Sequence, residues 1–106
     1  MNFVYFIADL EKDVVKIGTS KNPKFRLKQL QTSNSNRLAL LGYVEGNVSK
    51  ERYLQTYFRK YWLSGEWFKL DKDNSIIDYI NSVNLMDCFV DRIQGKVYVL
   101  NKMKNF

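Results

Sequence analysis

Histidine is absent from the sequence, and cysteine occurs once, at Cys88. Without histidine the chain cannot build a Ser-His-Asp triad, a Cys-His pair or a His-ligated metal site. A single thiol forms neither an internal disulfide nor a zinc site made of thiolates, so we expect an intracellular (cytoplasmic or nuclear), reducing environment and a buried Cys88. Any acid–base chemistry must come from Asp, Glu, Lys or Tyr, or from a metal-bound water.

Long apolar runs are also missing. No segment approaches the roughly 20 apolar residues that a membrane-spanning helix needs, so we expect no membrane partner. The N-terminal residues 1–5 lack the basic segment and the small-residue cleavage site of a signal peptide, and are typical of a first strand. With 106 residues, of which 45% are hydrophobic and 15% aromatic, the chain is expected to form one domain with one core.

Acidic residues are in deficit. The chain has 17 Lys and Arg against 11 Asp and Glu, a net charge of +6, which favours polyanionic partners such as nucleic acid. The residues expected to contact phosphates are Lys21, Lys24, Lys28 and Arg37 around the first predicted helix, and Lys50 and Arg52 on the second. Contacts of this kind give affinity with little sequence readout, although such a cluster can also be only a solvated face.

Hydrophobic patterning predicts an α/β (α+β) domain with a three-stranded antiparallel sheet flanked by helices, in the order ββαβαα, plus a C-terminal β-hairpin. The predicted elements are strands 3–8 and 13–19, a helix 23–31, a strand 38–44, a helix from 49 to about 62, a weaker helix within 71–83, and strands 88–93 and 96–100. We expect residues 1–70 to form the functional core and residues 71–106 to form a helix and hairpin extension of the same domain.

Capping residues mark the predicted helix starts. Asn22 followed by Pro23 is typical of a helix N-terminus, with asparagine as the cap and proline in the first turn. Ser49 is the expected cap of the second helix, and the cap of the third is ambiguous between Asp71 and Asp73.

The first hairpin brings a tyrosine and a lysine together. If residues 9–12 form its link, Tyr5 lies opposite Lys16 on one face, with Phe3 opposite Gly18. A lysine ammonium beside a phenol favours the phenolate, which is one way to obtain a base without histidine. The alternative is a strand aromatic beside a solvent-facing lysine.

One carboxylate falls in the apolar stripe of the second predicted helix. At 100° per residue, Glu51, Phe58 and Trp62 lie within about 20° of one another around the helix axis. Glu51 therefore faces the rest of the fold, where it could bind a hard divalent cation together with phosphate oxygens and waters. The alternative is a glutamate that stabilises the N-terminus of the helix.

An arginine lies at the edge of the first predicted helix. Arg26 flanks the apolar residues Leu27 and Leu30, so it can bury its stem and keep its guanidinium in a groove. The planar guanidinium suits bidentate binding of a phosphate. The alternative is an ordinary exposed helix arginine.

The order of these residues matches a known pattern. The series Val4-Tyr5-Phe6, Lys16-Ile17-Gly18, Arg26-Leu27, Glu51 and Gly65-Glu66-Trp67-Phe68 resembles the GIY-YIG nuclease superfamily. It is most similar to the short phage- and virus-type branch that has KIG in place of YIG and closes on an EWF motif. The resemblance covers residues 3 to about 70, and residues from Asp71 onward are not covered.

The resemblance implies an endonuclease that hydrolyses nucleic acid, with DNA favoured over RNA, using Mg²⁺ or Mn²⁺ and having low sequence specificity or a protein partner that supplies specificity. In that picture Tyr5 acts on the attacking water, and Lys16 assists Tyr5 or holds the water. Arg26 stabilises charge on the phosphoryl group, and Glu51 holds the metal. Gly18 allows close backbone approach because it lacks a Cβ.

Three departures from the superfamily pattern leave other functions open. Leu30 stands where many members carry Tyr or His, Gln55 stands where the similar branch often has His, and an asparagine expected after the glutamate helix is absent. A first alternative is a catalytically silent GIY-YIG-like module that binds nucleic acid. A second is a small adaptor that binds a protein partner through its aromatic-rich tail.

Overall fold

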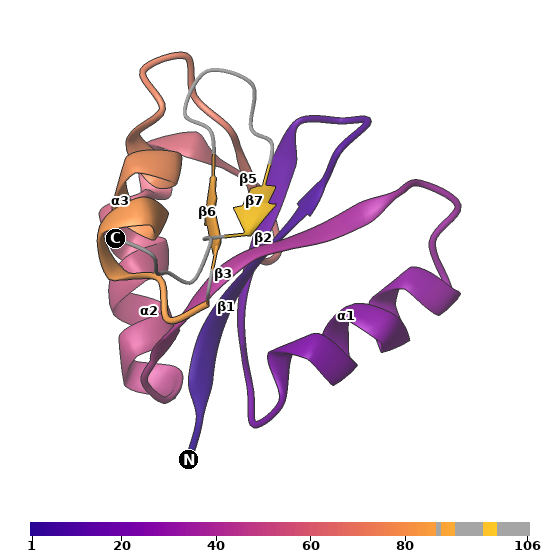
Figure 1. Cartoon of the computed structure of the whole chain (residues 1–106). Coiled ribbons are helices and arrows are strands. Elements are labelled where there is room, and N and C mark those ends of the chain that lie inside the picture. Colours follow the sequence, from indigo (N-terminus) through magenta and orange to yellow (C-terminus); the bar gives the residue numbers. More distant parts are fainter. Residues whose placement is uncertain (87, 91–96, 100–106) are drawn as a thin grey trace.

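A five-stranded antiparallel sheet forms the centre of the molecule. The computed structural model describes residues 1–86, 88–90 and 97–99 (Figure 1). The strands of the sheet are β1 (Phe3–Asp9), β2 (Val14–Ser20), β3 (Leu38–Glu45), β4 (Trp62–Ser64) and β5 (Trp67–Lys69), in the spatial order β3-β1-β2-β5-β4. The prediction of a mixed α+β fold with an antiparallel sheet is confirmed, whereas the predicted three strands and their order are wrong.

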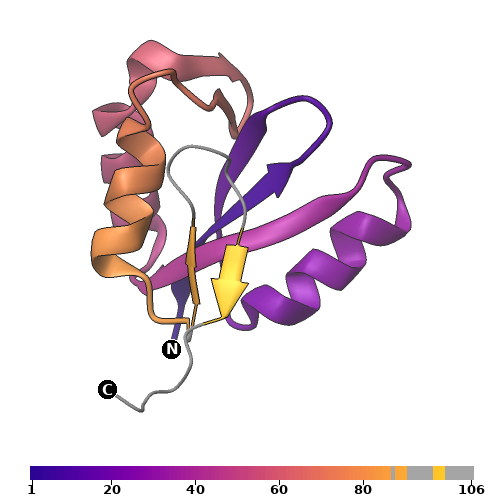
Figure 2. The same ribbon diagram turned by 45° about the horizontal axis from the view of Figure 1, so that its top comes forward.

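Helices cover both faces of this sheet. They are α1 (Pro23–Thr32), α2 (Val48–Tyr57) and α3 (Ser75–Val83), with a 3₁₀ turn, η1 (Arg59–Tyr61), after α2. Figures 1 and 2 show α1 alone on one face and α2 with α3 on the other. Two buried clusters match this division: Leu54, Phe58 and Ile80 pack under α2 and α3, while Leu27 and Leu30 of α1 pack on the opposite face.

Side-chain caps fix where the helices begin. The Asn22 side chain accepts a hydrogen bond from the Phe25 N–H, which confirms the predicted start of α1. The predicted cap of α2 is wrong: Asn47, not Ser49, accepts the capping bond, and it takes it from the Ser49 N–H. The Asp71 carboxylate accepts hydrogen bonds from the N–H groups of Ser75 and Ile76 at the start of α3, although Asp71 lies four residues before Ser75.

The unpredicted hairpin β4–β5 follows from the early end of α2. The helix ends at Tyr57, not near Trp62, and the chain continues in a tighter 3₁₀ turn in which the Tyr61 N–H bonds to the Phe58 carbonyl. Gly65, which lies just beyond the predicted end of this helix, is in the turn of the hairpin and has φ of +55°. Each strand of the hairpin has three residues, too few to show an alternating pattern.

The register of the first hairpin also differs from the prediction. Tyr5 pairs with Gly18, and Lys16 pairs with Ile7, so the link comprises residues 10–13 and not 9–12. The cause is Asp9, which is buried and whose Oδ1 accepts the N–H groups of Glu11 and Lys12. Asp9 thus closes the turn from the last paired position of β1. A shift of two residues keeps every side chain on its expected face.

A second, two-stranded sheet follows α3. It pairs β6 (Cys88–Val90) with β7 (Val97–Val99) in antiparallel fashion, so the predicted pairing of these segments is confirmed. The Asn81 side chain on α3 binds both the N–H and the carbonyl of Val90 and fixes β6 against the helix. The predicted Gln94-Gly95 turn and the Cys88 side chain lie outside the described residues.

Within the described residues, no helix is both long and apolar enough to cross a membrane.

Candidate active site

The Tyr5 hydroxyl ends against the backbone of β2. Tyr5 is 2% exposed and lies opposite Gly18 in the β1–β2 pair. A Cβ added to Gly18 would meet the Tyr5 Oη at 2.5 Å and Cζ at 2.7 Å. Only glycine leaves room for the phenol at this point of the strand.

Lys16 and Glu66 form an ion pair on the same face. The Lys16 Nζ lies 3.0 Å from the Glu66 Oε1, and it also lies 5.6 Å from the centre of the Trp67 ring. The observed register places Lys16 diagonal to Tyr5, not opposite it, at a typical spacing of about 7–8 Å. The Glu66 Oε1 would lie 3.1 Å from a Cβ on Gly18, so phenol, carboxylate and ammonium gather around this glycine.

The sequence pattern indicates Glu66 only as part of the EWF motif. Its place in the site follows from the hairpin β4–β5, because β5 pairs with β2 at Val14–Lys16 and carries Glu66 to the side of Gly18. The backbone carbonyl of Glu66 accepts the Ile17 N–H at 2.9 Å and continues this pairing by one residue. The position of Glu66 could be found only by recognising two three-residue strands.

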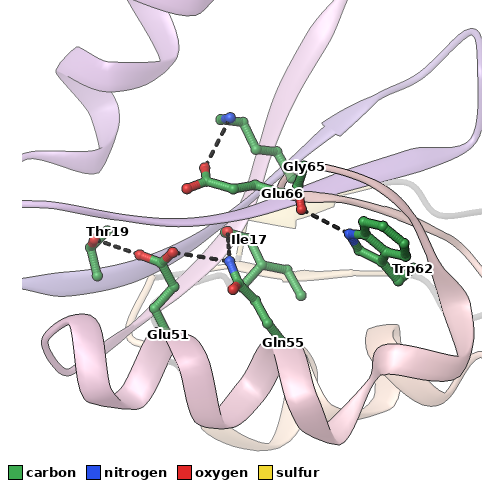
Figure 3. A network of polar contacts seen from close by, with 8 residues as sticks. Ile17, Thr19, Glu51, Gln55, Trp62, Gly65 and Glu66 are labelled. Atoms are coloured by element: carbon green, nitrogen blue, oxygen red, sulfur yellow. Dashed lines mark hydrogen bonds and ion pairs between the residues drawn. The ribbon is translucent and has the colours of Figure 1, made fainter.

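Glu51 is held at the edge of β2 by two hydrogen bonds (Figure 3). Its Oε1 accepts from the Thr19 hydroxyl at 2.6 Å, and its Oε2 accepts from the Gln55 Nε2 at 3.0 Å. The same Gln55 nitrogen donates to the Ile17 carbonyl at 2.9 Å. Gln55 therefore links the Glu51 carboxylate to β2. It does so from the position where the similar GIY-YIG branch often has histidine.

The interpretation of the α2 stripe is corrected in one respect. Phe58, which caps the C-terminus of α2, is 2% exposed and belongs to the core, as its predicted place in the stripe requires. Trp62 lies beyond the helix, in β4, and is 54% exposed. Glu51 itself is half-buried and faces β2, in agreement with a carboxylate directed toward the fold.

Tyr5 and Glu51 approach β2 from its two faces. Side chains alternate along a strand, so Gly18 faces the α1 side with Tyr5, whereas Ile17 and Thr19 face the α2 side. The phenol and the carboxylate thus contact neighbouring residues, Gly18 and Thr19, from opposite sides of one strand. In the described part of the chain the pairing of β2 with β5 ends with the bond from the Ile17 N–H to the Glu66 carbonyl, so no strand pairs with the outer edge of β2 at Gly18 and Thr19.

Arg26 stands apart from these groups. It is half-buried on α1, and its guanidinium bonds to the Gln29 Oε1 at 3.3 Å. Among the described residues no carboxylate forms an ion pair with Arg26, so its charge is open to an external anion. The other predicted phosphate-binding residues are exposed, except Lys50, which is half-buried: Lys21, Lys24, Lys28, Arg37, Lys50 and Arg52.

A cation at this site would depend mainly on one protein carboxylate. The described residues contain no group of three or more His, Cys, Asp or Glu side chains placed to share a metal ion. Glu51 has no ion pair with a lysine or arginine in the same part of the chain, and its two hydrogen bonds leave further lone pairs open. The donor set fits a hard cation that takes its other ligands from water and phosphate.

The structure is a mixed α+β domain with an antiparallel sheet and a group of polar side chains at one strand edge. The chain belongs to the T5orf172 domain family, a phage-associated family whose model matches residues 2–84. The match extends past residue 70 and includes α3. Neither the curated proteins nor the solved structures gave a significant match.

Proposed function

We propose that the chain is a metal-dependent endonuclease of the GIY-YIG type that hydrolyses DNA phosphodiester bonds with low sequence specificity. One observation carries the proposal: the Tyr5 hydroxyl and the Glu51 carboxylate contact neighbouring residues at an uncovered edge of β2. Membership in the T5orf172 family and the net charge of +6 support it. The backbone of a nucleic acid lying along this edge would have one of these groups on either face of the strand.

Each polar side chain has a role that its surroundings favour. Tyr5 orients the attacking water through its hydroxyl, and Lys16 holds the water or a phosphate oxygen beside Tyr5. Arg26 binds a phosphate oxygen and offsets the charge that develops on the phosphoryl group. Glu66 keeps the Lys16 ammonium in place through their 3.0 Å contact.

Glu51 would hold Mg²⁺ or Mn²⁺. When bound, the cation supplies charge stabilisation to the leaving oxygen. Thr19 and Gln55 orient the Glu51 carboxylate through bonds of 2.6 Å and 3.0 Å, so little ordering remains to be done when a cation arrives. Because a single carboxylate binds a divalent cation weakly, we expect metal affinity to rise when nucleic acid is present.

Cleavage of supercoiled plasmid in the presence of Mn²⁺ or Mg²⁺ tests the proposal. Wild-type protein should nick and linearise the plasmid, and Glu51→Gln should lower the rate by at least about 100-fold, since it keeps the shape of the side chain and removes the charge that binds the metal. Glu45→Gln is the matched control, because Glu45 is an exposed carboxylate at the end of β3. It should cleave as the wild type does.

The catalytically silent module remains the alternative, and Leu30 favours it. Leu30 packs against the buried cluster that contains Tyr5, so α1 offers no polar group to the water at that position. In that case the wild type would bind DNA with a salt-sensitive affinity but would not cleave it, whichever metal ion is added. The Glu51→Gln variant would bind as well as the wild type. Cleavage that survives Glu51→Gln would also refute the proposed role of the metal ligand.

A further inference from the structure

A cleft of about 400 Å³ lies beside α2. Gln55 separates it from Glu51, which contacts Thr19 on the other side (Figure 3). Arg52, Gln55 and Arg59 line it, together with the indole of Trp62. Phe68, which is 1% exposed, also contributes to its lining. The cleft is separate from the residues already assigned to the proposed reaction, except that Gln55 belongs to both.

Trp62 offers an aromatic surface whose polar edge is already satisfied. The indole is 54% exposed, yet its Nε1 donates to the Gly65 carbonyl at 2.9 Å (Figure 3). The hydrogen bond anchors the ring across the hairpin turn and uses its only donor. What remains available is the ring itself, which suits stacking with another planar group.

Two arginines give the cleft a positive charge. Arg52 and Arg59 are both exposed, and in the described part of the chain neither has an acidic partner within ion-pair distance. The residues found to line the cleft include no aspartate and no glutamate. An aromatic ring beside unpaired guanidinium groups matches a ligand that combines a planar face with negative charge.

We propose that this cleft binds an unpaired nucleotide of a nucleic-acid strand, with the base stacked on Trp62 and the phosphates held by Arg52 and Arg59. A base inside a duplex has both faces covered by its neighbours, so the cleft selects single-stranded segments or flaps over continuous duplex. The proposal rests on the nucleic-acid-binding part of the proposed function, and it names the substrate class of that site.

Gln55 connects this cleft to the proposed metal ligand. The side chain lines the cleft and at the same time donates to the Glu51 Oε2 at 3.0 Å. An unpaired nucleotide on Trp62 would therefore place its neighbouring phosphates close to Glu51. Cleavage would then fall next to the junction between paired and unpaired strands.

Fluorescence anisotropy with labelled oligonucleotides in EDTA tests the proposal without cleavage. The probes are dT20, rU20 and a 20-base-pair DNA duplex, and the preferred single strand identifies the sugar. Trp62→Leu should weaken binding of the preferred single strand about tenfold and leave duplex binding unchanged, since it removes the stacking surface alone. Trp62→Phe should retain most of the affinity, because phenylalanine still stacks.

Leu63→Ala is the matched control, because Leu63 is also an exposed apolar residue of β4 (49%) but does not line this cleft. It should bind every probe as the wild type does. Arg59→Ala should weaken single-strand binding and reduce the slope of log affinity against log salt by about 1.

Equal affinity of the wild type for single strands and duplex would overturn the proposal, as would Trp62→Leu that binds dT20 and rU20 like the wild type. The plasmid assay keeps this result separate from the fate of the proposed function. Trp62-dependent binding without cleavage supports the cleft and refutes the nuclease. Plasmid cleavage together with single-strand binding that is indifferent to Trp62 does the reverse.

Discussion

Replacing Gly18 with alanine tests the centre of the candidate site. The added methyl would lie 2.5 Å from the Tyr5 Oη and 2.7 Å from its Cζ, well inside van der Waals contact. Tyr5 cannot move away freely, because it is 2% exposed and packed against Ile7, Leu38 and Leu40. Overpacking of this kind costs about 1–3 kcal/mol, and the stiffer unfolded chain recovers about 0.4–1 kcal/mol.

We therefore expect Gly18→Ala to lower the free energy of unfolding by about 1–2 kcal/mol, measured by urea denaturation followed by circular dichroism. For a domain of this size the midpoint of thermal unfolding should fall by about 5–15 °C. Plasmid cleavage should fall further than stability explains, when it is measured well below the unfolding midpoint, because the phenol is displaced.

A double-mutant cycle with Tyr5→Phe identifies the atom responsible. Phenylalanine removes the Oη, which is the atom nearest to the added methyl, so Gly18→Ala should cost at least about 0.5 kcal/mol less in that background. Gly65→Ala is the control: Gly65 has φ of +55° and no heavy atom within 4 Å of a built Cβ. Its cost should be the same in both backgrounds.

A Gly18→Ala variant as stable as the wild type would refute the close contact between Tyr5 and β2. A cost that is identical in the wild-type and Tyr5→Phe backgrounds would show that strain arises elsewhere. Either result would remove the structural reason for a glycine at this position.

Two further predictions concern acid sensitivity and the core. Burial alone would raise the pKa of Asp71, but hydrogen bonds from the N–H groups of Ser75 and Ile76 outweigh it and hold the pKa below its ordinary value. The stability that results is present above about pH 4 and is lost as the pH falls through the lowered pKa. Asp71→Asn should therefore make the loss of stability between about pH 5 and 2, measured by circular dichroism, less steep than in the wild type. An equally steep loss in the variant would contradict this. Leu54→Ala should lower the free energy of unfolding by about 2–5 kcal/mol in urea, because Leu54 is 0% exposed beneath α2, and a loss below about 1 kcal/mol would mean that α2 packs loosely.

Sequence patterns predicted the elements with strong local signals. The start of α1 follows from Asn22 and Pro23, whose capping bond and fixed φ act within a few residues. Strands β1, β2 and β3 are long enough to be recognised from their apolar content. In each case the information lies inside the segment itself.

The hairpin β4–β5 could not be predicted because its strands owe their existence to partners elsewhere. Trp62–Ser64 is exposed along its whole length, and the hairpin is held in place where Val15 and Lys16 of β2 pair with Phe68 and Trp67. Such short strands have no period of their own, so only their tertiary pairing defines them.

The candidate site was predicted in part, for the same physical reason. Tyr5, Lys16 and Glu51 were recognisable by their order in the sequence, but their mutual geometry depends on the Asp9 turn and on how α2 lies across β2. Thr19 was not expected to bind Glu51, because its role depends on a contact over 32 residues of chain. Long-range contacts of single polar atoms leave no local pattern to read.

Because the turn begins at Asp9, the register of β2 against β1 depends on the number of residues in the link 10–13. Insertion of one amino acid that slid β2 along β1 by a single step would turn Gly18 toward α2 and Thr19 toward Tyr5. The phenol would then meet a branched side chain, and Glu51 would lose its hydroxyl donor in the same event. Homologous chains should therefore keep the length of this loop constant and vary in its composition, except at Asp13, whose φ of +55° favours Gly, Asn or Asp.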